Sequence, residues 1–233
     1  MVVYYRISDG GYSKVKPDYI TKENCLANCY KVFMINPELK EFVVIADKVS
    51  DTNVAKYQKI APKATFVRTN YGYGNKSYLF ALEMALKREK NEIVYLVEDD
   101  YLHLEGSYKI INEGLDISDY VSLYDHPDKY MARCNMGNPF VEEGGENTKV
   151  LLTKSTHWKI TNSTPMTFAA KVSTLLEDYE IHRHYCEGTM SDSFRMFLRL
   201  AKNSRKLVTP IPSWSTHGET QWLAPLIAWH KVK

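Results

Sequence analysis

The hydrophobic residues in the first hundred positions form short continuous apolar runs. The runs cover residues 2–7, 42–46, 64–68 and 93–97. They are rich in β-branched and aromatic residues, and each is too short for a typical helix. The pattern therefore predicts four strands, each buried in a sheet.

The segments between these runs have helical spacing. Thr21 is a predicted N-cap for a helix to Phe33, and Asp51 is a predicted cap for a helix to about residue 60. A third helix follows the loop at 70–75. Strands and helices thus alternate, which is typical of an α/β protein with a mostly parallel, doubly wound central sheet and helices on both of its faces.

The second half of the chain has shorter periodic segments. They predict helices at 106–114, 171–178 and 191–200, and strands at 120–124 and 166–170. Residues 149–153 and 157–161 are expected to pair as a hairpin. Residues 125–147 are rich in Pro, Gly, Asn and charge, and we expect a long loop there.

Composition narrows the class of protein. A chain of 233 residues is expected to form one large domain or two tightly joined halves. Its net charge of +2 implies no general affinity for polyanions such as nucleic acids. The N-terminus lacks the pattern of a signal peptide, and no apolar run is long enough to cross a membrane. The cysteines show no paired metal-type spacing, and Cys25 and Cys29 are expected to pack rather than to bridge. A cytoplasmic location is therefore the default expectation.

The fourth strand stops abruptly at three acids, Glu98, Asp99 and Asp100. Ligands of open α/β sheets bind outside the carboxyl ends of the strands. Three adjacent carboxylates there repel one another, and a divalent cation with a phosphate ligand would relieve that repulsion. A solvated turn or a helix N-terminus is an equally open interpretation of these acids alone.

Several motifs in order resemble the GT-A glycosyltransferases, of the large family-2-like group. The donor-binding half of that family resembles two segments of this chain: the strand at 42–47 with residues 50–52, and the glycine-bearing loop and helix at 70–85. The acidic segment at 97–100 resembles the family's DXD metal motif. Residues 187–200 resemble its catalytic segment. The resemblance covers roughly the whole chain and implies a GT-A-like, Rossmann-like fold. Residues 1–104 would form the nucleotide-sugar-binding half, and residues 105–233 the acceptor-binding and catalytic half of the same domain.

The resemblance also implies a cation site. Asp100 would ligate Mn²⁺ or Mg²⁺, and His217 resembles a C-terminal histidine that completes the metal site in many members. Glu98 would lie behind the ligands or reach the metal through water, and Asp99 would bind the ribose hydroxyls. A loop role for Glu98 and a plain packed or surface role for His217 remain alternatives.

Further candidates would contact the donor. Asp47 would accept the imide N–H of uracil or a similar base, with a turn role as the alternative. Gly74, with Gly72, permits tight turns near the donor. Arg68 and Lys76 would contact base or phosphate, although at least one of them is expected to be a solvated charge. Ser8 is a candidate contact in a loop that departs from the commoner opening of the family.

Asp192 is the candidate general base and Glu187 the reserve. In an inverting reaction a carboxylate takes the proton of the acceptor hydroxyl, and the nearby diphosphate would raise its pKa. A helix N-terminal acid is the alternative for Asp192. Trp214 is a candidate platform for the acceptor. Residues 182–185 are expected in a loop or strand that contacts acceptor or solvent, and residues 222–229 are expected to pack back on the domain.

The predicted function is therefore that of a metal-dependent glycosyltransferase of the hexosyltransferase type. It would move a sugar from a nucleoside-diphosphate sugar, with UDP favoured, to a carbohydrate-type acceptor hydroxyl. An inverting reaction is expected on the basis of Asp192. A sugar-phosphate nucleotidyltransferase is the first alternative, and residues 8–14 are a faint version of the glycine- and lysine-bearing loop it requires. A non-catalytic carbohydrate- or nucleotide-binding module is the second.

Overall fold

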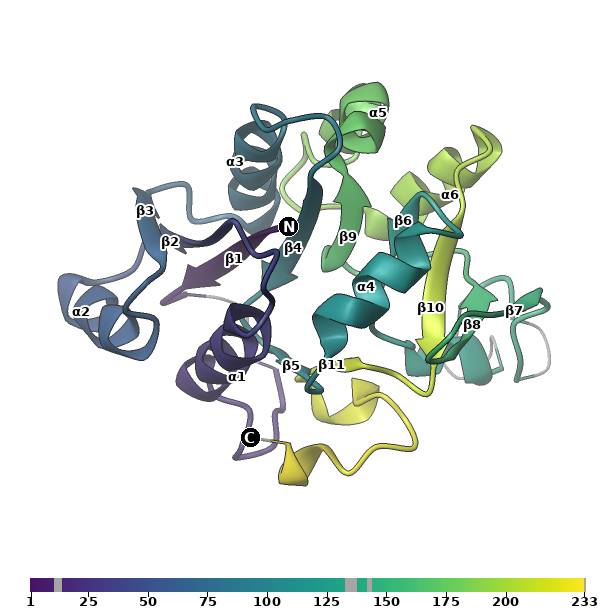
Figure 1. The fold of residues 1–233 in the computed structure, drawn as a ribbon, viewed down its shortest axis with the longest axis horizontal. Coiled ribbons are helices and arrows are strands. Elements are labelled where there is room, and N and C mark those ends of the chain that lie inside the picture. The colour runs from purple at the N-terminus through teal and green to yellow at the C-terminus, as the bar shows by residue number, and fades with distance from the viewer. Residues whose placement is uncertain (11–13, 133–137, 142–143, 233) are drawn as a thin grey trace.

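The computed structural model describes residues 1–10, 14–132, 138–141 and 144–232, and within these ranges nine strands form one sheet flanked by helices (Figure 1). The strand order is β3-β2-β1-β4-β9-β6-β10-β8-β7. These strands are β1 (Val2–Ser8), β2 (Glu41–Asp47), β3 (Thr65–Thr69), β4 (Ile93–Glu98), β6 (Tyr120–Val121), β7 (Val150–Leu152), β8 (His157–Ile160), β9 (Phe168–Lys171) and β10 (Leu207–Ile211). The helices are α1 (Lys22–Met34), α2 (Asp51–Ile60), α3 (Gly74–Ala85), α4 (Ser107–Leu115), α5 (Val172–His184) and α6 (Ser193–Lys202), with short 3-10 helices η1 (Pro127–Tyr130), η3 (Thr220–Trp222) and η4 (Trp229–Lys231).

The first four strands of the sheet are parallel and are linked by α1, α2 and α3. β1 lies in the middle of this half and is buried on both faces, as are most residues of β2 and β4. Strands buried on both sides need apolar residues at nearly every position, which explains the continuous runs in the sequence. The predicted doubly wound, mostly parallel sheet is confirmed for this half.

The other half continues the same sheet with mixed strand directions. β9 is antiparallel to β4 and to β6, whereas β10 is parallel to β6. The predicted hairpin is present as the antiparallel pair β7 and β8. β10 was not predicted because Pro210 lies within it and Pro212 directly follows it. Pro210 is tolerated because it lies beyond Val208, the last β10 residue that pairs with β6.

A second, two-stranded sheet lies at one edge of the large sheet. It pairs β5 (Tyr101–His103) with β11 (Ser215–His217) in antiparallel register. The two strands are too short for a hydrophobic pattern to reveal them. Their pairing places His217 opposite Tyr101, directly after Asp100.

The core has two apolar clusters, one on each face of the sheet. Helices α1, α2 and α4 cover one face, and α3, α5 and α6 cover the other (Figure 1). Alternation along β1 divides its side chains between the faces, so that Val3, Tyr5 and Ile7 join the first cluster and Val2 and Tyr4 the second. The three-layer arrangement confirms the predicted fold class.

Two local predictions are wrong. Ser50, not Asp51, is the N-cap of α2, and its hydroxyl accepts the Asn53 N–H; Asp51 is the first helical residue, where the helix dipole favours an acid. Residues 182–184 belong to α5, which runs past the predicted end at residue 178. His182 is fully buried and bonds the hydroxyls of Tyr78 and Tyr120, so it lies away from solvent, whereas Arg183 and His184 are exposed as expected.

The long loop at 125–147 is fixed to β8 and to the residues that follow it by two buried lysines. The Lys159 ammonium lies 2.8 Å from Asp125 and 3.5 Å from Glu146. Lys129, in η1, donates to Asn162 at 2.8 Å. Such buried charges are stable only when they are paired, so the described part of the loop has a defined structure.

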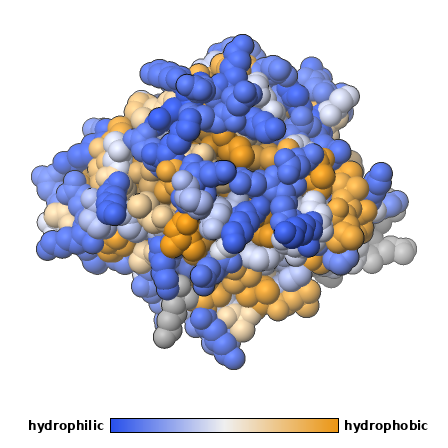
Figure 2. Space-filling model, viewed as in Figure 1, coloured by the Kyte–Doolittle hydropathy of each residue, from blue (hydrophilic) through white to orange (hydrophobic). Residues whose placement is uncertain are grey.

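The surface of the described residues is mixed in character. Hydrophilic residues cover much of the face in Figure 2, with hydrophobic patches between them.

Among the helices in the described ranges, none has the length and apolar character needed to cross a bilayer. Cys25, Cys29 and Cys186 are buried free thiols, and Cys134 lies outside the described residues. The tail packs back as predicted, because Trp229 is buried and donates its indole N–H to Ala224.

Candidate active site

The candidate site lies at the edge of the sheet where the parallel strands end. β1, β2, β3 and β4 all run toward this edge, and β6 and β10 run in the same direction as β4. The segments that follow β6 and β10 therefore reach the same edge as the acids that follow β4. This topology explains how residues 98–100 and 213–219, far apart in the sequence, form one site.

Asp100 and His217 form the centre of this site. The Asp100 carboxylate lies 3.3 Å from His217 Nε2 and 3.0 Å from the Lys16 ammonium. The Lys14 ammonium lies 3.2 Å from the same His217 nitrogen. Asp100 and His217 are both buried at 8% exposure, so these charges act in a medium much less polar than water. Burial raises the pKa of Asp100, but the adjacent His217 and Lys16 lower it more, and the carboxyl titrates well below its ordinary range.

Gly218 allows this close approach. A Cβ at this position would overlap the Ile20 side chain and lie 2.8 Å from the Asp100 carbonyl oxygen. The β5–β11 pairing fixes the neighbouring backbone, and Asn28 of α1 anchors β5 through two hydrogen bonds with the His103 backbone. The position of the His217 ring is therefore set by backbone structure rather than by contacts of the ring alone.

Asp99 belongs to a second group of contacts. Its Oδ2 atom accepts the Ser8 backbone N–H at 3.1 Å and lies 2.7 Å from the Lys22 ammonium. Lys22 is the first residue of α1 and also donates to the carbonyl oxygen of Ser8. The loop after β1 is thus attached to the acid motif.

Glu98 points to a different set of partners. Its carboxylate lies 3.5 Å from the Arg6 guanidinium and accepts the Thr167 hydroxyl at 3.3 Å. Arg6 is 6% exposed and also donates to the carbonyl oxygens of Gly74 and Met166. Glu98 therefore holds Arg6 against the start of α3 and the segment that precedes β9.

The donor set fits a partial cation site. In the described ranges, no three His, Cys, Asp or Glu side chains are grouped closely enough to enclose a metal ion. Asp100 supplies one ligand oxygen and His217 one ligand nitrogen. The Lys16 ammonium group lies beside the Asp100 oxygen, and the Lys14 ammonium group lies beside the His217 nitrogen. Mg²⁺ is commonly held by one or two carboxylates plus phosphate oxygens, and imidazole suits the later transition metals. Two protein ligands are therefore sufficient where a diphosphate supplies the rest.

Asp47 has a structural role in the loop after β3. Its carboxylate accepts the backbone N–H groups of Tyr71 at 2.6 Å and Gly72 at 2.8 Å, and the Thr69 hydroxyl at 2.9 Å. Gly72 has a φ of 74°, a conformation that favours glycine. A nucleobase imide would have to compete with these three donors for the Asp47 oxygens.

Arg68 and Lys76 are surface cations near this loop. Arg68 pairs with Asp51 and donates to the Val49 carbonyl oxygen at 3.0 Å. It lines an open depression with Lys48, Val49, Thr69 and Asn70. Lys76 lies 5.4 Å from the centre of the Tyr73 ring. Gly74 begins α3 and has open space where a Cβ would lie, so its backbone is accessible to a ligand.

Asp192 and Glu187 lie in a segment anchored near this edge. The Asn75 side chain, at the start of α3, donates to the carbonyl oxygens of Cys186 and Gly188. Asp192 is the N-cap of α6 and accepts the Arg195 N–H, with its side chain 40% exposed. Glu187 forms an exposed ion pair with Arg183. Asp192 thus has a capping role and also retains access to solvent.

Aromatic rings lie beside His217. The Tyr101 and Tyr124 rings are 5.3 and 6.2 Å from the His217 ring, and His126 lies between Tyr124 and Trp222. The Trp214 backbone pairs with Leu123 and Leu104, and its ring lies close to Gly106 at the start of α4. An acceptor platform at Trp214 stays a prediction, and the Trp222 ring lies 5.0 Å from the His126 ring.

Sequence reasoning missed the cations of this site. Arg6, Lys16 and Lys22 were not candidates, and Lys14 was noted only for the nucleotidyltransferase alternative. The available signal was three lysines within residues 14–22, directly after the loop at the end of β1. Lys14 and Lys16 belong to no strand or helix, so a pattern of period 2 or 3.6 does not reveal them, and the patterns of β1 and α1 do not show which partners Arg6 and Lys22 meet.

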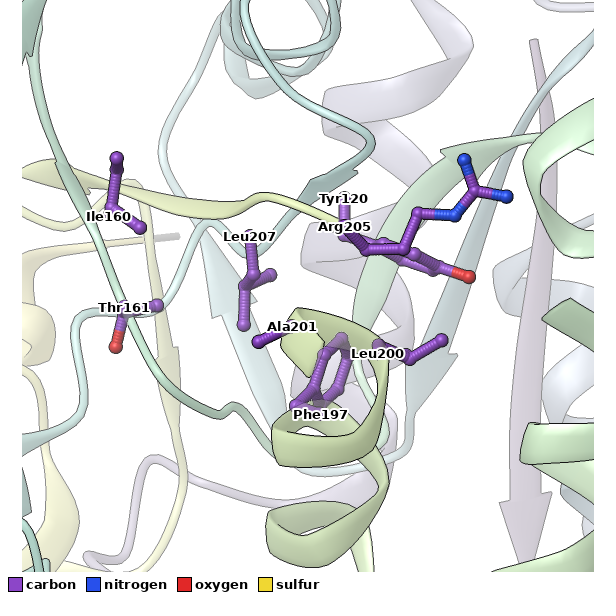
Figure 3. Close-up of a pocket in the computed structure, with 8 residues that line it drawn as sticks. All are labelled: Tyr120, Ile160, Thr161, Phe197, Leu200, Ala201, Arg205 and Leu207. Carbon is purple, nitrogen blue, oxygen red and sulfur yellow. The ribbon is translucent and has the colours of Figure 1, made fainter. Parts of the chain in front are cut away.

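A small cavity lies elsewhere, between α6 and the mixed end of the sheet (Figure 3). Its lining is largely apolar, and includes Phe197, Leu200 and Leu207. Leu207 begins β10 and therefore lies at the edge of the sheet opposite to the acids. The Arg205 guanidinium pairs with Asp178 at 2.7 Å and Glu177 at 2.6 Å. This cavity is a feature of the helix packing.

The structure is similar to solved structures of glycosyltransferases with the GT-A fold. It superposes on GalNAc-T7 with UDP, GalNAc and Mn²⁺ with a TM-score of 0.61 and 12% identity, over 93% of this chain and 42% of that one. For S. aureus TarS 1–349 the TM-score is 0.51 and the identity 17%, over 89% of this chain and 57% of that one. The chain thus spans about half the length of these two proteins.

A nucleotidyltransferase has a similar fold. The CMP:2-keto-3-deoxy-manno-octonic acid synthetase complexed with CTP gives a TM-score of 0.52 at 12% identity, over 89% of this chain and 88% of that one. The sequence matches no protein-family model and no curated protein. At these identities the comparisons establish the fold, and they confirm the predicted GT-A-like, Rossmann-like α/β architecture.

Proposed function

We propose that this protein is a metal-dependent glycosyltransferase. It would move a sugar from a nucleoside-diphosphate sugar, with UDP favoured, to an acceptor hydroxyl. The observation that supports this most is the Asp100–His217 pair, an oxygen and a nitrogen ligand 3.3 Å apart at the carboxyl edge of a GT-A-like sheet. Ligands of open α/β sheets bind at that edge.

The cation site would consist of Asp100 and His217, with the diphosphate oxygens as further ligands. Mn²⁺ or Mg²⁺ bound there would neutralise charge that develops on the leaving diphosphate. Glu98 would orient Arg6 through their ion pair and would not itself ligate the cation, because its carboxylate is directed at Arg6 and Thr167.

The nucleoside would lie along the ends of β1 and β2. Asp99, held by Ser8 and Lys22, would accept a ribose hydroxyl. Asp47 would shape the loop after β3 around the base, since its oxygens already bond Tyr71 and Gly72. Gly74 would face the donor, and Arg68 and Lys76 would be solvated charges at the outer rim.

Asp192 would be the general base of an inverting reaction, with Glu187 uninvolved. Its carboxylate would take the proton from the acceptor hydroxyl as that oxygen attacks the anomeric carbon. Three observations support the assignment: partial exposure, a position at a helix N-terminus, and the anchoring of residues 186–188 to α3. The Glu187 ion pair with Arg183 is exposed and needs no catalytic role.

Thermal melting with UDP and Mn²⁺ tests the binding part of this proposal. A ligand present at 100 times its Kd stabilises the folded state by about 2.7 kcal/mol. For a domain of this size that raises the Tm by roughly 5–10 °C. We expect this shift with UDP and Mn²⁺ together, and its loss in EDTA or in the Asp100→Asn variant.

The matched control is Asp116→Asn, the same change at an exposed C-cap of α4. It should keep the full shift. A shift that is equal with EDTA, or that persists in Asp100→Asn, contradicts the metal-dependent proposal. Absence of any shift with UDP, GDP or dTDP would favour a non-catalytic module that does not bind nucleotides.

A sugar-phosphate nucleotidyltransferase is the second candidate. It is favoured by the likeness to a synthetase complexed with CTP and by the lysines that follow β1. The two activities release different products. A screen of UDP-, GDP- and dTDP-sugars with Mn²⁺ should yield the nucleoside diphosphate from a glycosyltransferase. Pyrophosphate released from a nucleoside triphosphate and a sugar phosphate would instead identify the nucleotidyltransferase.

A further inference from the structure

Three lysines from one short segment face the acids of the candidate site. The Lys16 ammonium lies 3.0 Å from Asp100, and the Lys22 ammonium lies 2.7 Å from Asp99. Lys14 lies 3.5 Å from Glu219, in addition to its contact with His217. The contacted carboxylates are at most 21% exposed, so their charges are weakly screened by water.

The charges of this group balance. Three ammonium groups face three carboxylates, and the net charge is zero when His217 is neutral. A divalent cation that entered alone would leave two positive charges in a partly buried site. The diphosphate of a nucleotide sugar would alone leave two negative charges. When both enter together the site is neutral again, so the binding of each should strongly favour the binding of the other.

The Lys16 ammonium group occupies the position beside Asp100 that a divalent cation would take. Lys16 contacts the Asp100 Oδ2 atom that lies 3.3 Å from His217 Nε2. An ammonium group and a metal ion cannot both neutralise this oxygen at close range without repelling each other. Cation binding therefore requires Lys16 to move, and a diphosphate bound to the cation is the anion it would meet.

Lys16 is free to make this move and Lys22 is not. Among the described residues, Asp100 is the only ionic partner of Lys16, whose side chain is 28% exposed in a loop. Lys22 is fixed in the first turn of α1 and also donates to the carbonyl oxygens of Ser8 and Gly10. A lysine carries its charge on a flexible four-carbon stem, which suits an exchange of partners.

We propose that Lys16 is an exchangeable counter-ion of Asp100: it neutralises the carboxylate in the absence of donor, and it transfers to the donor diphosphate when a divalent cation takes its place. This inference rests on the proposed function, since it requires that a cation and a nucleoside diphosphate share the site. Lys16 then opposes binding of the cation alone and supports binding of the cation with the nucleotide.

The test measures Mn²⁺ and UDP binding for the wild type and Lys16→Gln. Free Mn²⁺ is followed by electron paramagnetic resonance with and without UDP, and UDP binding by calorimetry at saturating Mn²⁺. Removal of one positive charge at this range should tighten Mn²⁺ binding in the absence of UDP at least about tenfold. UDP binding at saturating Mn²⁺ should weaken by roughly the same factor, because the diphosphate loses a cationic partner.

Lys56→Gln is the matched control. It removes the same charge from α2, where Lys56 pairs with Glu23 at the exposed surface. It should leave both affinities unchanged. Thermal melting of each variant verifies that the fold is intact.

The possible results distinguish a failure of the inference alone from a failure of the proposed function. If wild type and Lys16→Gln bind Mn²⁺ alone with equal affinity while UDP tightens Mn²⁺ binding in both, the exchange is overturned and the proposed function stands. If the wild type binds no Mn²⁺ even with UDP, the metal-dependent proposal fails and the exchange fails with it. If UDP binds equally well in EDTA and only Lys16→Gln abolishes this, Lys16 replaces the metal permanently, which overturns both.

Discussion

Single residues at the carboxyl edge of the sheet determine what this site can bind. Asp100 is a buried carboxylate with an imidazole and an ammonium as neighbours, and its pKa is held below the ordinary range. A buried charge is strongly destabilising unless it is compensated. Asp100 is therefore ionised at neutral pH and needs a positive partner in every state of the protein.

The Asp192→Asn variant tests the catalytic assignment. A general base contributes about 10²–10⁴-fold to turnover, so kcat should fall by about that factor while the Kd for UDP with Mn²⁺ stays unchanged. Asn retains an oxygen that can cap α6, and the fold should therefore persist. The measurement is UDP release from the preferred donor, together with calorimetric binding of UDP.

Glu187→Gln is the control for this prediction. The pair with Arg183 is exposed and screened by solvent, and the variant should turn over like the wild type. Wild-type turnover in Asp192→Asn, or a loss in Glu187→Gln alone, would move the base to another residue.

The sequence indicated the acids and the histidine but not the cations that surround them. Asp99 and Asp100 directly follow an apolar run, and a strand end is a position that the sequence pattern can locate. Lys16 and Lys22 approach these acids through the fold of a loop and the first turn of a helix. Their contacts depend on tertiary structure, and no local pattern specifies them.

At the scale of elements, the short pair β5–β11 completes the site. It joins the segment after β4 to the segment after β10 and sets His217 beside Asp100. Gly218 makes the joint possible, because a side chain there would meet Ile20 and the Asp100 backbone. The site thus depends on a close contact between two backbones.

The Gly218→Ala variant should separate this contact from general stability. Forcing a methyl group into a packed region costs about 1–3 kcal/mol. That cost should lower the Tm by roughly 2–12 °C, since each kcal/mol shifts the Tm of such a domain by about 2–4 °C. Displacement of β11 should also weaken the binding of UDP with Mn²⁺ by at least tenfold, as measured by calorimetry below the melting range.

Gly114→Ala is the matched control for overpacking. Its Cβ would lie 2.6 Å from Val121 and 2.7 Å from Trp158, in the core and away from the acids. It should lower the Tm while nucleotide binding remains normal. Equal losses of binding in the two variants would show that instability alone explains the effect of Gly218→Ala.

The predictability of the elements differs between the two halves of the sheet. β1, β2, β3 and β4 were predicted from apolar runs because they are central strands with helices between them. β5 and β11 are three residues long and are defined by their partners, whereas β6 was predicted as the longer segment 120–124. β10 contains Pro210. In the sequence this proline argues against a strand, although the observed strand pairing tolerates it.

At the scale of the whole molecule, one continuous sheet holds both halves of the proposed reaction. The parallel strands end at the acids and the loops of the donor side. The mixed strands bring His217, the aromatic rings near it, and the Lys159-anchored loop to the same edge. The fold class could be predicted from strand and helix alternation, whereas the union of these segments at one edge follows from the strand directions.

The central claim is that Asp100 and His217 hold a cation that also binds a nucleoside diphosphate. Its most direct test is an anomalous difference map from crystals grown with MnCl₂ and UDP. We predict one Mn²⁺ peak within ligand distance of Asp100 Oδ2 and His217 Nε2, with the UDP phosphates completing its coordination. Ordered UDP with no Mn²⁺ at these two side chains, or Mn²⁺ bound at a different place, would contradict the claim.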